Sequence, residues 1–161
     1  MGTDPKLYPT LIDIYHQMHS RKKFKEYVNV ERIGEMDENL DEEFKLVTFV
    51  AYKDKRPIAA LTGSALGDTG IGLLGGITEM AMKCQASHLL QWEIIKYFKN
   101  AGCKKYDLGG IDPKKNQSVY YFKQGISDIE VSEIGIFESN DNYLLRLLIK
   151  ILEKLKKIFL N

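Results

Sequence analysis

The sequence lacks most of the features that mark secreted, disulfide-bonded or strongly charged proteins. Only two cysteines, Cys84 and Cys103, occur in 161 residues. They lack the spacing of a C-x-x-C metal or redox site, so we expect reduced, partly buried thiols. No uninterrupted apolar run reaches the ~18 residues of a membrane span, and no secretion signal precedes the first charged residues. These absences predict a cytoplasmic protein.

Net charge is also small. The 23 basic residues are nearly balanced by 22 acidic residues, which leaves a formal charge of +1. No global basic field therefore favours nucleic acid, and any contact with it would depend on a local patch. A hydrophobic content of 44% is enough for one core at this length, so residues 1–161 are expected to form a single domain.

Periodicity of the apolar residues predicts a mixed α/β fold. Spacing of three and four residues predicts helices, and β-rich runs separated by turn residues predict strands. The predicted helices are residues 11–18, 30–44, 87–101 and 142–160, and the predicted strands are residues 46–52, 58–66, 71–77, 105–108 and 129–138. The first three strands form a meander. Helix 87–101, ended by Gly102, then connects strand 71–77 to strand 105–108, so we expect these two strands to be parallel.

The stretch that follows this helix carries the candidate site. A short strand ends in Gly109 and Gly110, which lack a Cβ and therefore allow close approach of a ligand or a tight turn. Ligands usually lie at the carboxyl ends of strands in open α/β sheets. Asp112 and Pro113 are typical of a turn, and the next residues, Lys114 and Lys115, are candidates for a phosphate contact.

A metal site is not predicted. His16 and His19 are one turn apart on the first helix, but no carboxylate or third ligand lies nearby in the sequence, so solvated histidines are the favoured interpretation.

The run Tyr-Asp-Leu-Gly-Gly-Ile-Asp-Pro (residues 106–113) and the Tyr-x-Phe-Lys-x-Gly pattern that ends at Gly125 resemble the Fem-type (FemABX-like) peptidyl transferases. Members of this family transfer an amino acid from aminoacyl-tRNA to the peptide stem of a peptidoglycan precursor. They contain two GNAT-like domains in tandem, and the motif belongs to the second. The resemblance thus implies a GNAT-like fold and identifies the chain as the C-terminal half of a two-domain protein.

The resemblance also implies roles for individual residues. Lys123 matches the lysine that the family places in the channel through this domain. Phe122 and Tyr120 are candidates for stacking on a terminal base, or else are core aromatics. The residues predicted to be catalytic are Lys123, Asp107 and Tyr106, and a structural role in capping the loop is the alternative for Asp107. The residues predicted to bind substrate are Phe122, Tyr120, Gly109, Gly110, Lys114 and Lys115.

No cofactor is predicted beyond the donor substrate, aminoacyl-tRNA. Acetyl-CoA-binding GNAT proteins usually begin the crossover helix with a Gln/Arg-x-x-Gly-x-Gly/Ala loop that binds the pyrophosphate. Residues 83–88 read Lys-Cys-Gln-Ala-Ser-His and contain no glycine, so acetyl-CoA is expected only under an alternative function. That alternative is a free-standing N-acyltransferase using acetyl-CoA or another acyl donor, and a third is a non-catalytic module that binds tRNA or a partner domain.

The expected partners follow from the resemblance and from the last helix. They are aminoacyl-tRNA, a nucleotide- or lipid-linked muropeptide, and a first GNAT-like domain. Helix 142–160 combines a wide apolar stripe with Arg146, Lys150 and three further lysines. It is expected to pack on the domain, to dock the partner domain, or to lie on an anionic membrane, which would place the protein at the inner face of that membrane.

Overall fold

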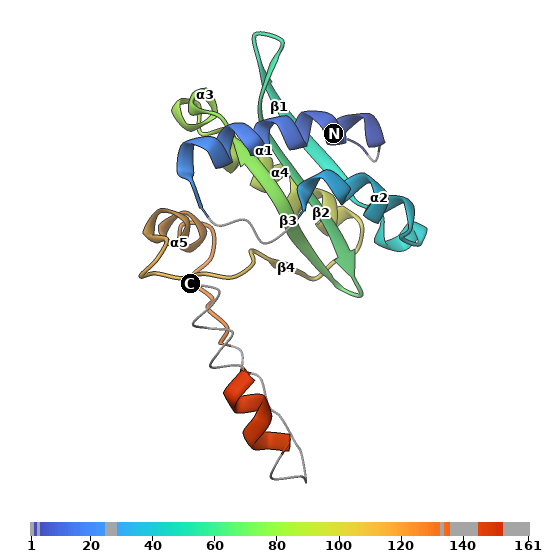
Figure 1. Ribbon diagram of the computed structural model, residues 1–161. Coiled ribbons are helices and arrows are strands. Elements are labelled where there is room, and N and C mark those ends of the chain that lie inside the picture. The colour runs from blue at the N-terminus through green and yellow to red at the C-terminus, as the bar shows by residue number, and fades with distance from the viewer. Residues whose placement is uncertain (1, 3, 25–28, 133, 136–144, 153–161) are drawn as a thin grey trace. The chain divides into compact units, whose positions relative to one another are not determined.

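The computed structural model describes residues 2, 4–24, 29–132, 134–135 and 145–152 (Figure 1). The chain divides into two compact units, Met1–Lys123 and Gln124–Asn161. We describe the two units separately, and the candidate site lies in the first.

A mixed four-stranded sheet forms the centre of the first unit. Its order is β1 (Val47–Lys53), β2 (Arg56–Leu66), β3 (Thr69–Ile77) and β4 (Lys105–Asp107). The first three strands are antiparallel neighbours, and β4 pairs parallel to β3. The predicted meander, the crossover and the parallel pair are therefore confirmed.

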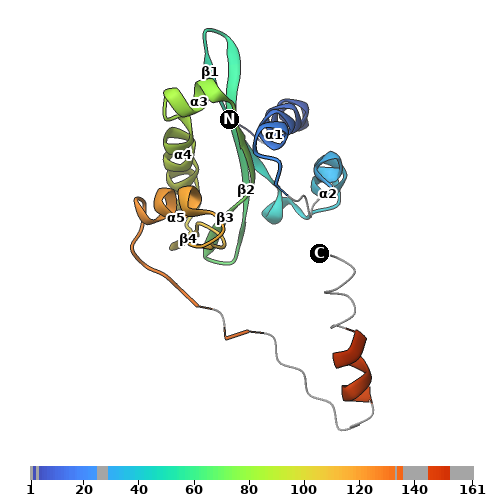
Figure 2. The same ribbon diagram turned by 60° about the vertical axis from the view of Figure 1, so that its left-hand side comes forward.

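Helices cover both faces of this sheet, as Figure 2 shows. One face is covered by α3 (Glu79–Lys83) and α4 (Ala86–Asn100), and the other by α1 (Tyr8–Lys22) and α2 (Ile33–Glu38). This three-layer arrangement confirms the predicted α/β class.

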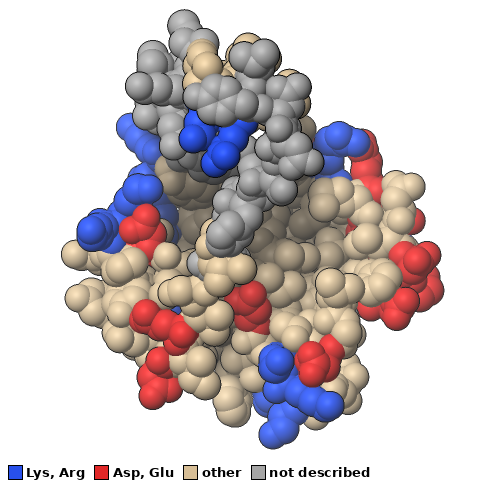
Figure 3. Space-filling view, turned by 90° about the horizontal axis from the view of Figure 1, so that it is seen from below, with Lys and Arg blue, Asp and Glu red and all other residues tan. Residues whose placement is uncertain are grey.

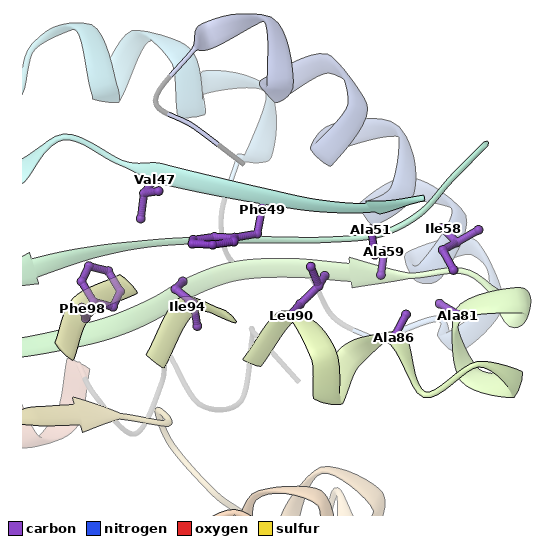
Figure 4. Packing of buried hydrophobic residues seen from close by; sticks show 10 residues of the cluster. All are labelled: Val47, Phe49, Ala51, Ile58, Ala59, Ala81, Ala86, Leu90, Ile94 and Phe98. Carbon is purple, nitrogen blue, oxygen red and sulfur yellow. The ribbon is translucent and has the colours of Figure 1, made fainter. Parts of the chain in front are cut away.

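In the core on the α4 side, most of the larger side chains lie toward one end and the alanines toward the other (Figure 4). Leu90, Ile94 and Phe98 lie one turn apart on α4 and are at most 4% exposed, and burial of each contributes about 1.5–3 kcal/mol. The helix approaches closely because the strands carry glycine opposite it. A Cβ on Gly63 would lie 2.8 Å from Ile94 Cδ1, and one on Gly70 would lie 2.5 Å from Phe98 Cγ.

The α1 side has its own core. Leu11 and Ile14 on α1 are fully buried and pack with Leu46, directly before β1, and with Ala60 of β2. Gly76 on β3 is in contact with the helix backbone itself, since a Cβ there would lie 2.8 Å from the Tyr15 nitrogen. The end of β3 is thereby held against α1.

The predicted helix over residues 30–44 is only partly correct. Helical hydrogen bonding stops after Glu38, and short 3₁₀ turns (Val30–Arg32 and Glu42–Phe44) flank α2. Asp37 explains the break, because its buried carboxylate accepts a bond of 2.7 Å from the Leu46 backbone N–H and so anchors the start of β1. The acidic face predicted to lie in water thus contributes one buried carboxylate to the fold.

The second unit departs from prediction. Residues 129–132 and 134–135 form no strand, so the expected edge strands over 129–138 are wrong for the part that the structure describes. Residues 145–152 are helical, as predicted, and the remainder of the predicted helix 142–160 lies outside the described residues. None of the described helices is long and apolar enough to cross a membrane.

Candidate functional site

The candidate site begins where β3 and β4 separate. Their parallel pairing covers only Thr69–Ile71 of β3, opposite Lys105–Asp107. Among the described residues, the rest of β3, from Gly72 to Ile77, has no strand partner on this side. We call this point of separation the β3–β4 fork.

A β-bulge lies directly after the fork. Leu74 pairs with Thr62 and Gly72 pairs with Gly63, so Leu73 is the extra residue in β3. Bulges bend a strand and redirect its backbone groups, and they are common beside active sites. Leu73 is accordingly 54% exposed. The fork thus presents backbone donors and acceptors that the sheet does not use.

Tyr106 on β4 reaches into the start of this unpaired edge. Its hydroxyl accepts a hydrogen bond of 2.7 Å from Gln91 Nε2 on α4. Its ring stacks on Phe98, with centroids 6.0 Å apart. A Cβ placed on Gly72 would lie only 2.7 Å from the hydroxyl oxygen, so glycine is needed for this approach.

The protonation state of Tyr106 follows from its environment. Burial raises the pKa of its hydroxyl to about 12, the Asp107 carboxylate adds to this, and the Gln91 hydrogen bond opposes it. The hydroxyl is therefore neutral at physiological pH and can act as a hydrogen-bond donor.

A second cluster forms at the glycine pair. The Asp107 carboxylate accepts a bond of 2.7 Å from the Gly109 backbone N–H, and Gly109 adopts a left-handed φ of 76°. Lys123 Nζ donates to the Gly110 carbonyl at 2.8 Å. These contacts bring together four predicted residues: Asp107 of β4, Gly109 and Gly110 in the turn after it, and Lys123 of α5 (Gln117–Gln124).

Lys123 lies in the last turn of α5. Its side chain is half-buried, and burial lowers the pKa of the ammonium, while the nearby Asp107 carboxylate raises it. In the structure this lysine fastens α5 to the glycine turn.

The predicted aromatic residues take separate places. The Phe122 ring contacts the His88 ring in the first turn of α4, at a centroid distance of 4.8 Å. Tyr120 is half-buried and meets Tyr121 edge-on at 5.5 Å. Phe122 thus links α5 to α4.

Lys114 and Lys115 lie on the exposed turn before α5. Both backbone N–H groups donate to Asp112 Oδ1 at 3.0 Å, and the Lys115 bond is the main cause that lowers the pKa of this carboxyl. The turn chemistry predicted for Asp112 is confirmed. On the face seen in Figure 3, described Lys and Arg side chains form small groups separated by uncharged and acidic surface.

Comparison with known proteins identifies the family of this arrangement. The model of the acetyltransferase (GNAT) domain family matches residues 1–124. The chain belongs to the GNAT acetyltransferase-domain family. No curated protein matches the chain.

Solved structures share the fold of this GNAT domain at low sequence identity. The aminoglycoside acetyltransferase meta-AAC0020 from an uncultured soil metagenomic sample, in complex with sisomicin, is 10% identical with a TM-score of 0.61, over 85% of this chain and 92% of that one. A tetramutant of the BH1408 protein from Bacillus halodurans is 14% identical with a TM-score of 0.59, over 87% and 98%. The acetyltransferase AAC(6')-Iy, in complex with a CoA bisubstrate analogue, is 15% identical with a TM-score of 0.54, over 78% and 92%.

The family implies coenzyme A, but the residues before α4 do not fit a pyrophosphate cradle. The turn there has no glycine, and Gln85 occupies a left-handed position with φ of 54° that glycine would adopt more easily. The Cys84 sulfur accepts a hydrogen bond of 3.3 Å from Lys53 Nζ. The His88 ring, in the first turn of α4, contacts the Phe122 ring. The turn therefore lacks the glycines that would let its backbone approach the phosphates closely.

Sequence reasoning missed two contacts that involve β3 or β4, and one on α1. The Gln91–Tyr106 bond joins residues 15 positions apart and has no signal in a helical pattern. Arg21 at the end of α1 donates to the Ile77 carbonyl at the end of β3, at 3.1 Å. His16 pairs with Glu31 at 2.7 Å, a carboxylate that is distant in the sequence.

Proposed function

We propose that this GNAT domain is an N-acyltransferase that holds an activated acyl group at the β3–β4 fork, where an amine of the acceptor attacks it. The observation that carries the proposal is the end of parallel pairing at Ile71, followed at once by the bulge at Leu73. Membership of an acetyltransferase family supports the same class of reaction.

The chemistry needs no covalent enzyme intermediate. The acceptor amine attacks the carbonyl carbon of an ester or thioester, a C–N bond forms, and the bond from carbonyl carbon to leaving group breaks. The amine loses a proton and the leaving group gains one, so the products are an amide and an alcohol or thiol. The domain must align the two partners and stabilise the negative charge that develops on the carbonyl oxygen.

The cluster at the fork offers groups for these tasks. The neutral Tyr106 hydroxyl beside Gly72 is suited to donate to the developing oxyanion. Lys123 holds the glycine turn in place and adds positive charge beside it. The Asp107 carboxylate already accepts from Gly109, so we assign it a structural role in the turn.

A second candidate is Fem-type aminoacyl transfer, with aminoacyl-tRNA as donor and a nucleotide- or lipid-linked muropeptide as acceptor. The glycine-free turn before α4 and the His88–Phe122 contact favour it, because an aminoacyl ester of tRNA needs no CoA cradle. Under this proposal a first GNAT-like domain completes the acceptor site.

Mass spectrometry of the products formed from competing donors tests both candidate functions. Purified protein is incubated with an amine acceptor panel and with acetyl-CoA, with aminoacyl-tRNA, or with both. Amide product from either donor supports acyl transfer, and the donor that gives product selects between the candidates. Absence of product from both donors, with a stem-peptide acceptor included, would refute the proposed function.

A further inference from the structure

Gln91 is the polar side chain of α4 that faces the fork. It is half-buried on the face of α4 that also carries Ile94 and Phe98. Its carboxamide nitrogen lies 2.7 Å from the Tyr106 hydroxyl. The half-buried Gln91 carboxamide thus donates a hydrogen bond to the Tyr106 hydroxyl.

Within the described part of the chain, the Tyr106 hydroxyl accepts this bond and donates none. A phenolic hydroxyl has one proton to donate and can also accept. When Gln91 donates to the oxygen, the proton must point elsewhere. The oxygen also lies beside Gly72, the first residue beyond the β3–β4 pairing, where a Cβ would be 2.7 Å away.

We propose that Gln91 is a positioning residue, which directs the Tyr106 proton away from α4 and toward the acyl carbonyl at the fork. The inference rests on the proposed function. Gln91 touches neither substrate nor reacting atoms, and it acts through Tyr106.

Two features keep the hydroxyl in this orientation. The ring is fixed by stacking on Phe98, which is itself 3% exposed. The absence of a side chain at Gly72 leaves room for the hydroxyl against β3. Rotation of the O–H group is then the remaining freedom, and the Gln91 bond removes it.

Replacement of Gln91 by glutamate gives the sharpest test because it keeps the shape and reverses the hydrogen bond. A carboxylate accepts and cannot donate, so Tyr106 would turn its proton toward α4. We expect Gln91→Glu to lower kcat by about 100-fold, close to the effect of Tyr106→Phe, with KM nearly unchanged. Gln117→Glu, the same change on the exposed first turn of α5, is the matched control and should retain wild-type kcat.

A readout without turnover separates this inference from the proposed function. With tyrosine labelled at ¹³Cζ, the Tyr106 resonance is assigned by its loss in Tyr106→Phe, and its pKa is measured by titration. Because the Gln91 bond lowers the pKa of Tyr106, Gln91→Glu should raise this pKa above the wild-type value, and Gln117→Glu should leave it unchanged.

The outcomes are distinguishable. If the wild-type protein transfers an acyl group and Gln91→Glu does so equally fast, the positioning role is refuted while the proposed function stands. If no donor gives product, the proposed function fails, and an unchanged Tyr106 pKa in Gln91→Glu would then overturn the Gln91–Tyr106 contact as well. A lower kcat together with a raised pKa supports the inference.

Discussion

Gly72 and Tyr106 should be energetically coupled. In Gly72→Ala the new Cβ would lie 2.7 Å from the Tyr106 hydroxyl oxygen, which is closer than real Cβ contacts allow. The phenol cannot easily move away, because it is stacked on Phe98 and bonded to Gln91. The substitution must therefore displace the ring, break the hydrogen bond, or shift the strand.

The size of the coupling follows from these distances. Overpacking of this kind costs about 1–3 kcal/mol of unfolding free energy. Removal of the hydroxyl leaves Tyr106 Cζ at 3.9 Å and Leu61 Cδ1 at 3.5 Å as the nearest atoms, both ordinary contacts. In a Tyr106→Phe background, Gly72→Ala should thus be neutral, or stabilising by about 0.5 kcal/mol because alanine suits a strand better than glycine.

Urea unfolding of the four proteins in this cycle measures the coupling. We expect an interaction free energy of about 1–3 kcal/mol, seen as a change in midpoint at constant m-value. Gly75→Ala is the control, since its Cβ would meet Ala60 and Leu61 but not Tyr106, and its cost should be equal in both backgrounds. Equal destabilisation by Gly72→Ala in both backgrounds would contradict the contact on which the site is built.

Three further predictions concern catalysis, ionisation and packing. Lys123→Ala should lower kcat by about 10- to 100-fold through loss of charge and of the turn contact, while Lys99→Ala at the exposed end of α4 retains activity in the same transfer assay. The pKa of Tyr106 is raised from 10.0 to about 12 in the folded protein, so its contribution to stability is complete below about pH 10 and is lost as pH rises through about 12. The urea midpoint of wild type should fall over that window more than that of Tyr106→Phe, and equal declines would argue against a buried phenol. Ile94→Ala, at a fully buried position, should lower the unfolding free energy measured in urea by about 2–5 kcal/mol. Leu89→Ala, where the leucine is 55% exposed, should lower it by less than about 0.5 kcal/mol.

Much of the fold could be predicted because its elements carry local signals. Alternation and turn residues predicted the meander, and the helical period of α4 with Gly102 after it predicted the crossover. The helical period did not predict which apolar residues of α4 are buried, since Leu89 and Trp92 are 55% and 60% exposed. Burial depends on which face of the helix the sheet covers, since Leu90 is buried although its neighbour Leu89 is exposed.

The errors arose where a single long-range contact overrides a local pattern. The buried Asp37 carboxylate binds the Leu46 N–H and ends a helix that the spacing would have continued. In the second unit, alternation alone predicted edge strands over residues 129–138, but alternation does not provide a neighbouring strand with which to pair.

Sequence reasoning named candidate residues for the site but not the contacts between them. Lys123 lies close to the glycine pair because its ammonium donates to the Gly110 carbonyl, and it does so from the last turn of a helix. Gln91 could not have been found, because its role depends on a phenol that the parallel pairing of β3 and β4 brings beneath α4.

Backbone amide NMR with hydrolysis-resistant acyl donors tests the central claim most directly. Acetonyl-CoA and an amide analogue of aminoacyl-adenosine are added separately to ¹⁵N-labelled protein. The account predicts that at least one of them shifts the backbone amides of Gly72–Ile77 and of Tyr106, with smaller changes along β1. Shifts confined to other parts of the protein, or no binding of either analogue, would contradict an acyl site at the β3–β4 fork.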